Sequence, residues 1–184
     1  FILDFFGSKY VLWLGVFTLA LVITVVFVEY AFLTEVESTF NTGSNQNQEQ
    51  SLAYFFGIFF AVGEAVIFIA KTFFSGRIIN RYGLKFTLNV LPVGLLVLTG
   101  LFFFSQLFGQ LFPDSIYLWV IGFMMLYSNI SKSSLTDPTF FTLFQPLDKQ
   151  TRFEKYNAVG IVENVAYAVA GFGLIFTNWV GGFS

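Results

Sequence analysis

The chain has 184 residues, of which 56% are hydrophobic and only 11% are charged, about half the charged share of a soluble domain. It contains no cysteine and no histidine, which excludes disulfides, thiol nucleophiles, serine–histidine triads and the usual zinc sites. The net charge of −2 argues against nucleic-acid binding, which needs a basic surface. We therefore expect an integral membrane protein that is not an enzyme and uses no metal or cofactor.

Long apolar stretches fill the chain. About 20 apolar residues span a bilayer core, and only a helix satisfies the backbone of a single span there. The fold class we predict is all-α membrane, with one membrane domain over residues 1–184. Its five transmembrane helices are expected over residues 10–32, 51–74, 86–112, 115–131 and 157–180. The chain begins without methionine, and five helices is an odd number for a transporter unit, so we expect a fragment of a longer protein.

The positive charges indicate an orientation. Outside the predicted helices, lysine and arginine occur only before the first helix, between the second and third, and between the fourth and fifth: Lys9, Arg77, Arg81, Lys85, Lys132, Lys149, Arg152 and Lys155. The other face carries acidic residues only. By the positive-inside rule, we expect these three regions and the N-terminus to be cytoplasmic, in a bacterial inner membrane. Lys71, near the inner end of the second helix, can extend toward the same surface.

A basic turn follows the second helix and reads Gly76-Arg-Ile-Ile-Asn80-Arg81-Tyr-Gly83-Leu-Lys85. It resembles the signature loop of the major facilitator superfamily, where such a loop latches two halves of a transporter. Gly76 would permit a close helix approach, and Gly83 a backbone turn with positive φ. Because Asn80 stands in place of the usual aspartate, it can cap a helix but cannot form a charge-based latch. The alternative is a basic turn that only obeys the positive-inside rule.

A second motif lies between the fourth and fifth helices. Asp137-Pro138-Thr139 is followed after six residues by Pro146-Leu147-Asp148. Together with Val28-Glu29-Tyr30, these residues resemble the ATP/ADP translocase (nucleotide transporter) family. The resemblance covers most of the chain in the expected order. It implies that the five helices belong to the C-terminal half of a twelve-helix transporter.

The sequence departs from this family where the family carries charge. Phe140-Phe141 stand where a lysine and a glutamate follow the first motif, and residues 153–156 and 167–173 lack most of the expected cations. A nucleotide carries several negative charges and needs cations on its path. The scaffold therefore resembles a nucleotide transporter, whereas the charge pattern does not support ATP as cargo.

Several polar residues lie inside the predicted helices, where a charge costs about 3 kcal/mol on insertion scales. Glu64 lies near the middle of the second helix, and Lys71 follows seven residues later, on almost the same face. In the fifth helix a three–four spacing places one stripe on a common face: Gly160, Glu163, Asn164, Tyr167 and Gly171. We take Glu64, Lys71, Glu163 and Asn164 as candidate substrate or proton sites in a cavity between these helices. The alternative is that they hold helices together through hydrogen bonds.

Polar residues also close the fourth helix. Asn129 and the run Ser131–Ser134 are typical of capping and interface positions. In residues 132–156, apolar and polar side chains alternate, so this segment could lie in the headgroup plane. Pro138 and Pro146 are expected to interrupt any long helix there.

Two functions remain open on the sequence. The first is a secondary transporter of a polar or anionic metabolite that alternates access between two halves. The second is a non-transporting subunit that keeps the transporter fold and anchors a membrane complex. The partners we expect are the lipid bilayer and either the missing half of the chain or other membrane subunits. The retained Glu64 favours the first function, and the missing cations favour the second.

Overall fold

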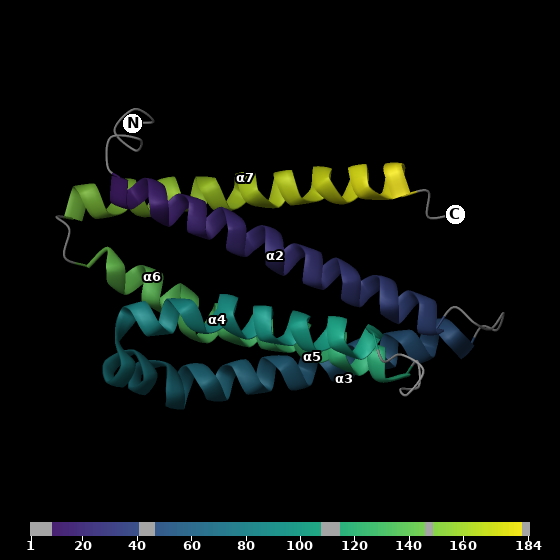
Figure 1. The fold of residues 1–184 in the computed structure, drawn as a ribbon. Coiled ribbons are helices and arrows are strands. Elements are labelled where there is room, and N and C mark those ends of the chain that lie inside the picture. Colours follow the sequence, from purple (N-terminus) through teal and green to yellow (C-terminus); the bar gives the residue numbers. More distant parts are fainter. Residues whose placement is uncertain (1–8, 41–46, 108–114, 146–148, 182–184) are drawn as a thin grey trace. The chain divides into compact units, whose positions relative to one another are not determined.

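The computed structural model describes residues 9–40, 47–107, 115–145 and 149–181, and every regular element in these ranges is helical (Figure 1). This confirms the all-α class. The elements are α2 (Lys9–Phe40), α3 (Asn47–Ile69), η1 (Ala70–Ser75), α4 (Gly76–Leu107), α5 (Ser115–Ser131), η3 (Lys132–Thr136), α6 (Asp137–Leu143) and α7 (Lys149–Gly181). The two η elements are π-helical turns.

Three stretches of the described residues are long and apolar enough to cross a membrane: Leu12–Phe40, Gln50–Phe104 and Arg152–Thr177. The second of these includes Gly83, whose dihedral angles (φ 82°, ψ 167°) are not helical and divide α4 in two. The chain reverses there, so that α4 runs back beside the end of the preceding helix (Figure 1). The positive φ predicted for Gly83 is therefore confirmed.

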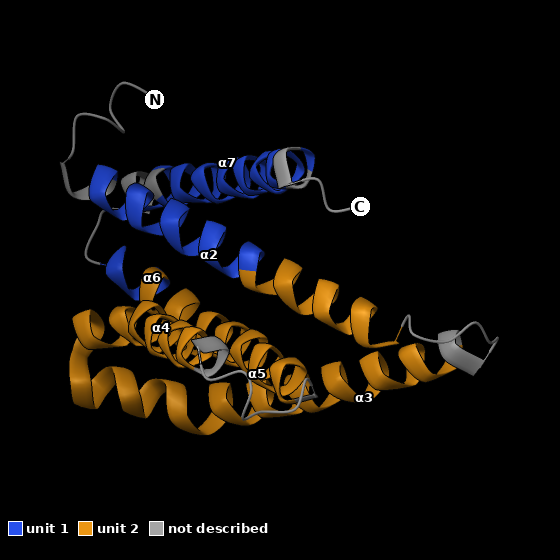
Figure 2. Cartoon of the chain, turned by 45° about the vertical axis from the view of Figure 1, so that its right-hand side comes forward, with its two compact units in different colours: residues 1–27, 141–184 blue, residues 28–140 orange. Residues whose placement is uncertain are grey.

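The chain divides into two compact units (Figure 2). One contains residues 1–27 and 141–184, and the other contains residues 28–140. Helix α2 contributes to both, since the division falls between Phe27 and Val28.

The unit of residues 28–140 is built on α5, which packs against both α3 and α4. Two glycines allow this close approach. The Tyr127 hydroxyl donates a hydrogen bond to the Val90 carbonyl oxygen at 2.6 Å, and a Cβ at Gly94 would overlap the tyrosine ring. A Cβ at Gly63 would lie 3.0 Å from the Leu126 side chain. Both contacts place the backbones of α3 and α4 nearer to α5 than larger residues would allow.

A cluster of phenylalanines joins α2 to α3 in the same unit. Phe32 is fully buried, and its ring stacks on Phe59 with centroids 4.7 Å apart. Phe55 and Phe56 lie around it at 6.4 and 6.3 Å. Large apolar rings contribute both buried area and favourable ring geometry, so this cluster fixes α2 against α3.

In the unit that contains α7, two rings and one hydrogen bond connect residues 141–145 to the helix. Phe141 and Phe144 each meet the Tyr156 ring edge-on. The Arg152 guanidinium donates a hydrogen bond to the Gln145 carbonyl oxygen at 2.5 Å. These contacts pack residues 141–145 against the first turns of α7. The helix begins at Lys149, whereas the sequence predicted a start at residue 157.

Pro138 does not interrupt the helix, contrary to the prediction. The chain stays helical from α5 through η3 into α6. Proline normally clashes with the carbonyl group four residues earlier. Here the preceding turn is π-helical, and the Asp137 N–H donates to the Lys132 carbonyl oxygen five residues back. We attribute the tolerance of Pro138 to this wider turn. Pro146, the second predicted break, lies outside the described residues.

The basic segment predicted as a turn over residues 75–85 is helical except at Gly83. A single residue with positive φ is enough to reverse the chain, so no longer loop is needed. The close helix approach predicted at Gly76 is not found, because a Cβ there would meet nothing within 4 Å. Helix α2 also extends to Phe40, beyond the predicted residue 32.

Candidate functional site

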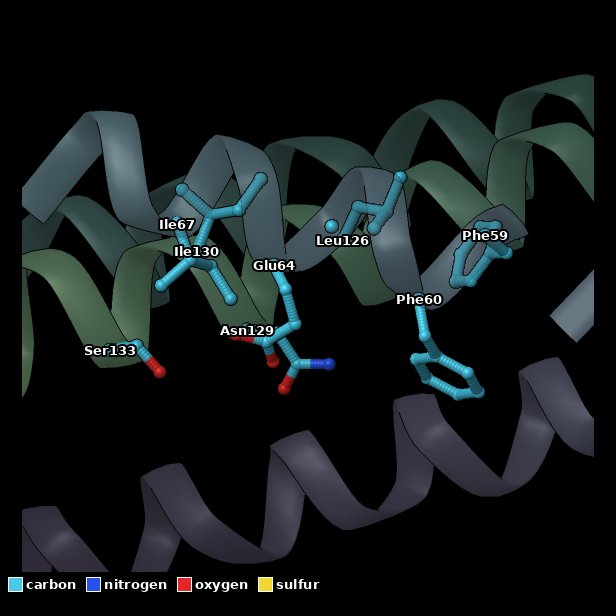
Figure 3. A pocket seen from close by; sticks show the side chains of 9 residues that line it. Phe59, Phe60, Glu64, Ile67, Leu126, Asn129, Ile130 and Ser133 are labelled. Atoms are coloured by element: carbon cyan, nitrogen blue, oxygen red, sulfur yellow. The ribbon is translucent and has the colours of Figure 1, made fainter. Parts of the chain in front are cut away.

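A pocket of about 200 Å³ lies between α3 and the continuous helix α5–η3. All of its lining residues belong to the unit of residues 28–140. They are Phe59, Phe60, Gly63, Glu64, Ile67, Leu126, Asn129, Ile130 and Ser133 (Figure 3). We call this cavity the Glu64 pocket.

Helical periodicity explains how each helix contributes to the pocket. Residues three, four and seven positions apart share one helix face. On α3 this spacing joins Phe60, Glu64 and Ile67, and on α5 and η3 it joins Leu126, Asn129 and Ser133. Buried Gly63 brings the two helices together, since a Cβ there would lie 3.0 Å from the Leu126 side chain.

The polar end of the pocket consists of Glu64, Asn129 and Ser133. Figure 3 shows the Glu64 carboxyl group and the Asn129 amide extending from facing helices toward the same space, with the Ser133 hydroxyl farther along. Glu64 is exposed, and the other two are half-buried. Among the described residues, the Glu64 carboxylate has no hydrogen bond and no ion pair. Its charge is therefore open to a ligand or a proton.

Charge near the pocket is negative. None of the lining residues is a lysine or an arginine. Lys132 precedes the lining residue Ser133, but its charge interacts with Glu29 on α2. Glu64 is the charged side chain among the lining residues, so the lining itself carries a negative charge.

Lys71, predicted two turns from Glu64 on almost the same helix face, is exposed and does not line the pocket. The same-face prediction assumed 3.6 residues per turn. The π-helical turn η1 begins at Ala70 and closes its hydrogen bonds over five residues. Lys71 is the second residue of this turn and lies outside the pocket lining.

Glu163 and Asn164 lie on α7, in the other unit, and do not line the Glu64 pocket. Glu163 is half-buried and Asn164 is exposed. The predicted close approach at the glycines of this stripe is not found, since a Cβ at Gly160 or at Gly171 would meet nothing within 4 Å. The buried residues of α7 are small apolar ones instead: Ala158, Val159, Ala166 and Ala170.

The predicted gating loop consists of Gly76, Asn80, Arg81, Gly83 and Lys85. All of these residues are exposed, and the Arg81 guanidinium carbon lies 5.7 Å from the centre of the Tyr82 ring. The sequence analysis missed Thr87, which is fully buried. Its hydroxyl donates to the Gly83 carbonyl oxygen at 2.8 Å and so supports the chain reversal. The sequence offered one indication of this role, because Thr87 lies four positions after the turn glycine Gly83.

The predicted family motif is only partly described. Asp137 is exposed, whereas Thr139 is fully buried. The hydroxyls of Thr139 and of buried Ser134 have no hydrogen-bond partner among the described residues. Pro146, Leu147 and Asp148 lie outside the described residues. The run after Asn129 is thus a partly buried polar segment inside a continuous helix, and the predicted helix end at Ser131–Ser134 is wrong.

A family model described as TLC ATP/ADP transporter matches residues 2–167. No curated protein matches the chain, and no solved structure does. The matched range includes α2, the Glu64 pocket, the Gly83 reversal and the motif that begins at Asp137.

Proposed function

Because this chain belongs to the TLC ATP/ADP transporter family, we propose that it forms part of a secondary transporter for a polar or anionic metabolite other than ATP and ADP. That the chain is a transporter-like membrane protein follows from the family and from the three apolar stretches long enough to cross a membrane. Secondary transporters bind cargo near the middle of the bilayer, where helices line a polar cavity.

The architecture that we propose has five crossings and forms part of a major-facilitator-type half. The reversal at Gly83 supports it, because the stretch Gln50–Phe104 has 55 residues, far more than the roughly 20 that one crossing needs. The positive-inside rule places the N-terminus and the gating loop in the cytoplasm of a bacterial cell. The partners in this proposal are the bilayer and a second helical half.

The observation that carries the proposal is the Glu64 pocket itself. A carboxylate within a long apolar helix is expensive in a membrane, and such residues typically mark substrate or proton pathways. Glu64 meets this description, because it lines a cavity with Asn129 and Ser133 and has no partner among the described residues. Lys71, Glu163 and Asn164 remain proposed sites outside this pocket.

The alternative is a non-transporting subunit with the transporter fold, which anchors or scaffolds a membrane complex. One observation favours it. Phe141, at a position where the exchangers that this chain resembles carry charge, is exposed and contacts the Tyr156 ring. A hydrophobic contact there holds α7 in place but offers nothing to a charged substrate.

Purification of the native protein separates the two functions. We expect the intact mass of the chain to show a second helical half, and the purified protein to contain no other stoichiometric subunit. Transport by alternating access requires that second half. A chain without it, purified in a fixed ratio with other membrane subunits, would support the scaffold and contradict the transporter.

A further inference from the structure

We infer that the Glu64 pocket binds a small organic cation, with an ammonium group between the Glu64 carboxylate and the Phe60 ring. This inference rests on the proposed function, because it names the chemical class that the transport site would take. Of the polar or anionic metabolites in that proposal, it selects polar ones that carry a positive charge and excludes the anionic ones.

The first argument is the charge of the pocket. Glu64 is the charged residue of the lining, and Lys132, which precedes the lining residue Ser133, interacts with Glu29. An ionised carboxylate among apolar side chains needs a positive partner or a proton. The described residues supply no partner, so a ligand with a positive charge would complete the site. A phosphate or carboxylate ligand would be repelled.

The second argument is the aromatic ring one helical turn before Glu64. Phe60 is 44% exposed and lines the pocket on the same helix face as Glu64 (Figure 3). Its ring is held by Phe56, with centroids 5.8 Å apart. An ammonium group binds favourably over an aromatic face, and recognition of quaternary ammonium ligands uses this contact.

The third argument is the size of the pocket and the hydrogen-bonding groups at its polar end. A volume of about 200 Å³ is below the usual range for drug-sized ligands, so the ligand has few heavy atoms. Asn129 and Ser133 offer donors and acceptors at the polar end. A small amine that carries a hydroxyl group would use the carboxylate, the ring and these two side chains together.

Equilibrium dialysis of the whole purified protein tests the inference with radiolabelled choline and ethylammonium. The competitors are the neutral isostere 3,3-dimethylbutan-1-ol and the anion 3,3-dimethylbutanoate. We expect saturable binding of an ammonium probe, weak competition by the alcohol and none by the anion. Glu64→Gln should weaken binding about tenfold or more, because it removes a charged partner. Phe60→Leu should weaken it several-fold.

The matched control is Glu37→Gln, which removes an exposed carboxylate outside the pocket and should leave ammonium binding unchanged. Thermal unfolding of each variant shows whether it is folded. The inference is overturned if neither ammonium probe binds at millimolar concentration, if the anion binds as well as choline, or if folded Glu64→Gln binds normally.

Uptake into proteoliposomes separates this inference from the proposed function. Ammonium binding that depends on Glu64, without uptake of the bound probe or of any metabolite tested, would keep the inference and contradict transport. Saturable uptake of an anionic metabolite, unchanged in Glu64→Gln, would keep transport and overturn the inference.

Discussion

No exchange of ATP for ADP is expected when the whole protein is reconstituted into proteoliposomes, despite its family. A nucleotide brings several negative charges into a region of low dielectric, where each missing cation matters. The chain has Phe140 and Phe141 where the exchangers that it resembles carry charge, and no lysine or arginine after Lys155. The described pocket is lined by a carboxylate and by no cation. Every charge identified at this site therefore disfavours the phosphates.

The assay is uptake of radiolabelled ATP into vesicles loaded with ADP. An exchanger of the same family, reconstituted in the same lipids, controls for the vesicles. We expect uptake at the level of protein-free vesicles. Saturable exchange at micromolar ATP would show that helices outside this chain supply the missing charges, and that the pocket charge does not decide the cargo.

Gly83→Ala should destabilise the protein, although the space around Gly83 is open. Gly83 has φ 82° and ψ 167°, a region that is essentially restricted to glycine, and a side chain there costs about 1–3 kcal/mol. The cost arises from the backbone, since a Cβ at this position would meet nothing within 4 Å. The hydrogen bond from Thr87 to the Gly83 carbonyl oxygen would also be disturbed. Thermal unfolding in detergent measures the effect.

Gly76→Ala is the matched control, because Gly76 belongs to the same predicted gating loop. Its dihedral angles are helical (φ −62°, ψ −37°), and its surroundings are open. Alanine gains about 0.5–1 kcal/mol over glycine inside a helix, so this variant should be as stable as the natural protein or more stable. Equal destabilisation by the two variants would contradict the assigned reversal at Gly83.

The helices were predictable because their signal is local. Long apolar stretches depend only on composition, and three stretches of the described residues are long and apolar enough to cross a membrane. The two π-helical turns were not predictable, because no composition or spacing in η1 and η3 distinguishes them from α-helix. One of them explains a correction: the helix continues through η3 and past Pro138.

Only part of the candidate site was visible in the sequence. Glu64 was identifiable because a carboxylate in an apolar helix is conspicuous. Asn129 and Ser133 were not, because polar residues near a helix end are usually caps, and only the packing of α5 on α3 brings them beside Glu64. Thr87 was missed because its role is a hydrogen bond to one carbonyl group, and only its position four residues after the turn glycine Gly83 could have indicated it.

The central claim is that Glu64 lies on a water-filled path through a five-crossing membrane protein. Because the chain has no cysteine, single substitutions can be labelled with an impermeant quaternary-ammonium methanethiosulfonate. Two exposed positions calibrate the topology: Tyr82→Cys should react only from the cytoplasmic side, and Glu37→Cys only from the opposite side. Phe68→Cys, on α3 and not in the pocket lining, controls for lipid-facing residues and should not react.

Labelling of Glu64→Cys in intact and inverted vesicles is the most direct test. A methanethiosulfonate reacts with thiolates in water and hardly at all with thiols in hydrocarbon, because the thiolate requires solvation. We predict that Glu64→Cys reacts from at least one side, much faster than Phe68→Cys, with the two topology controls on opposite sides. A rate for Glu64→Cys as low as that of Phe68→Cys would place the carboxylate in lipid and contradict the transport site.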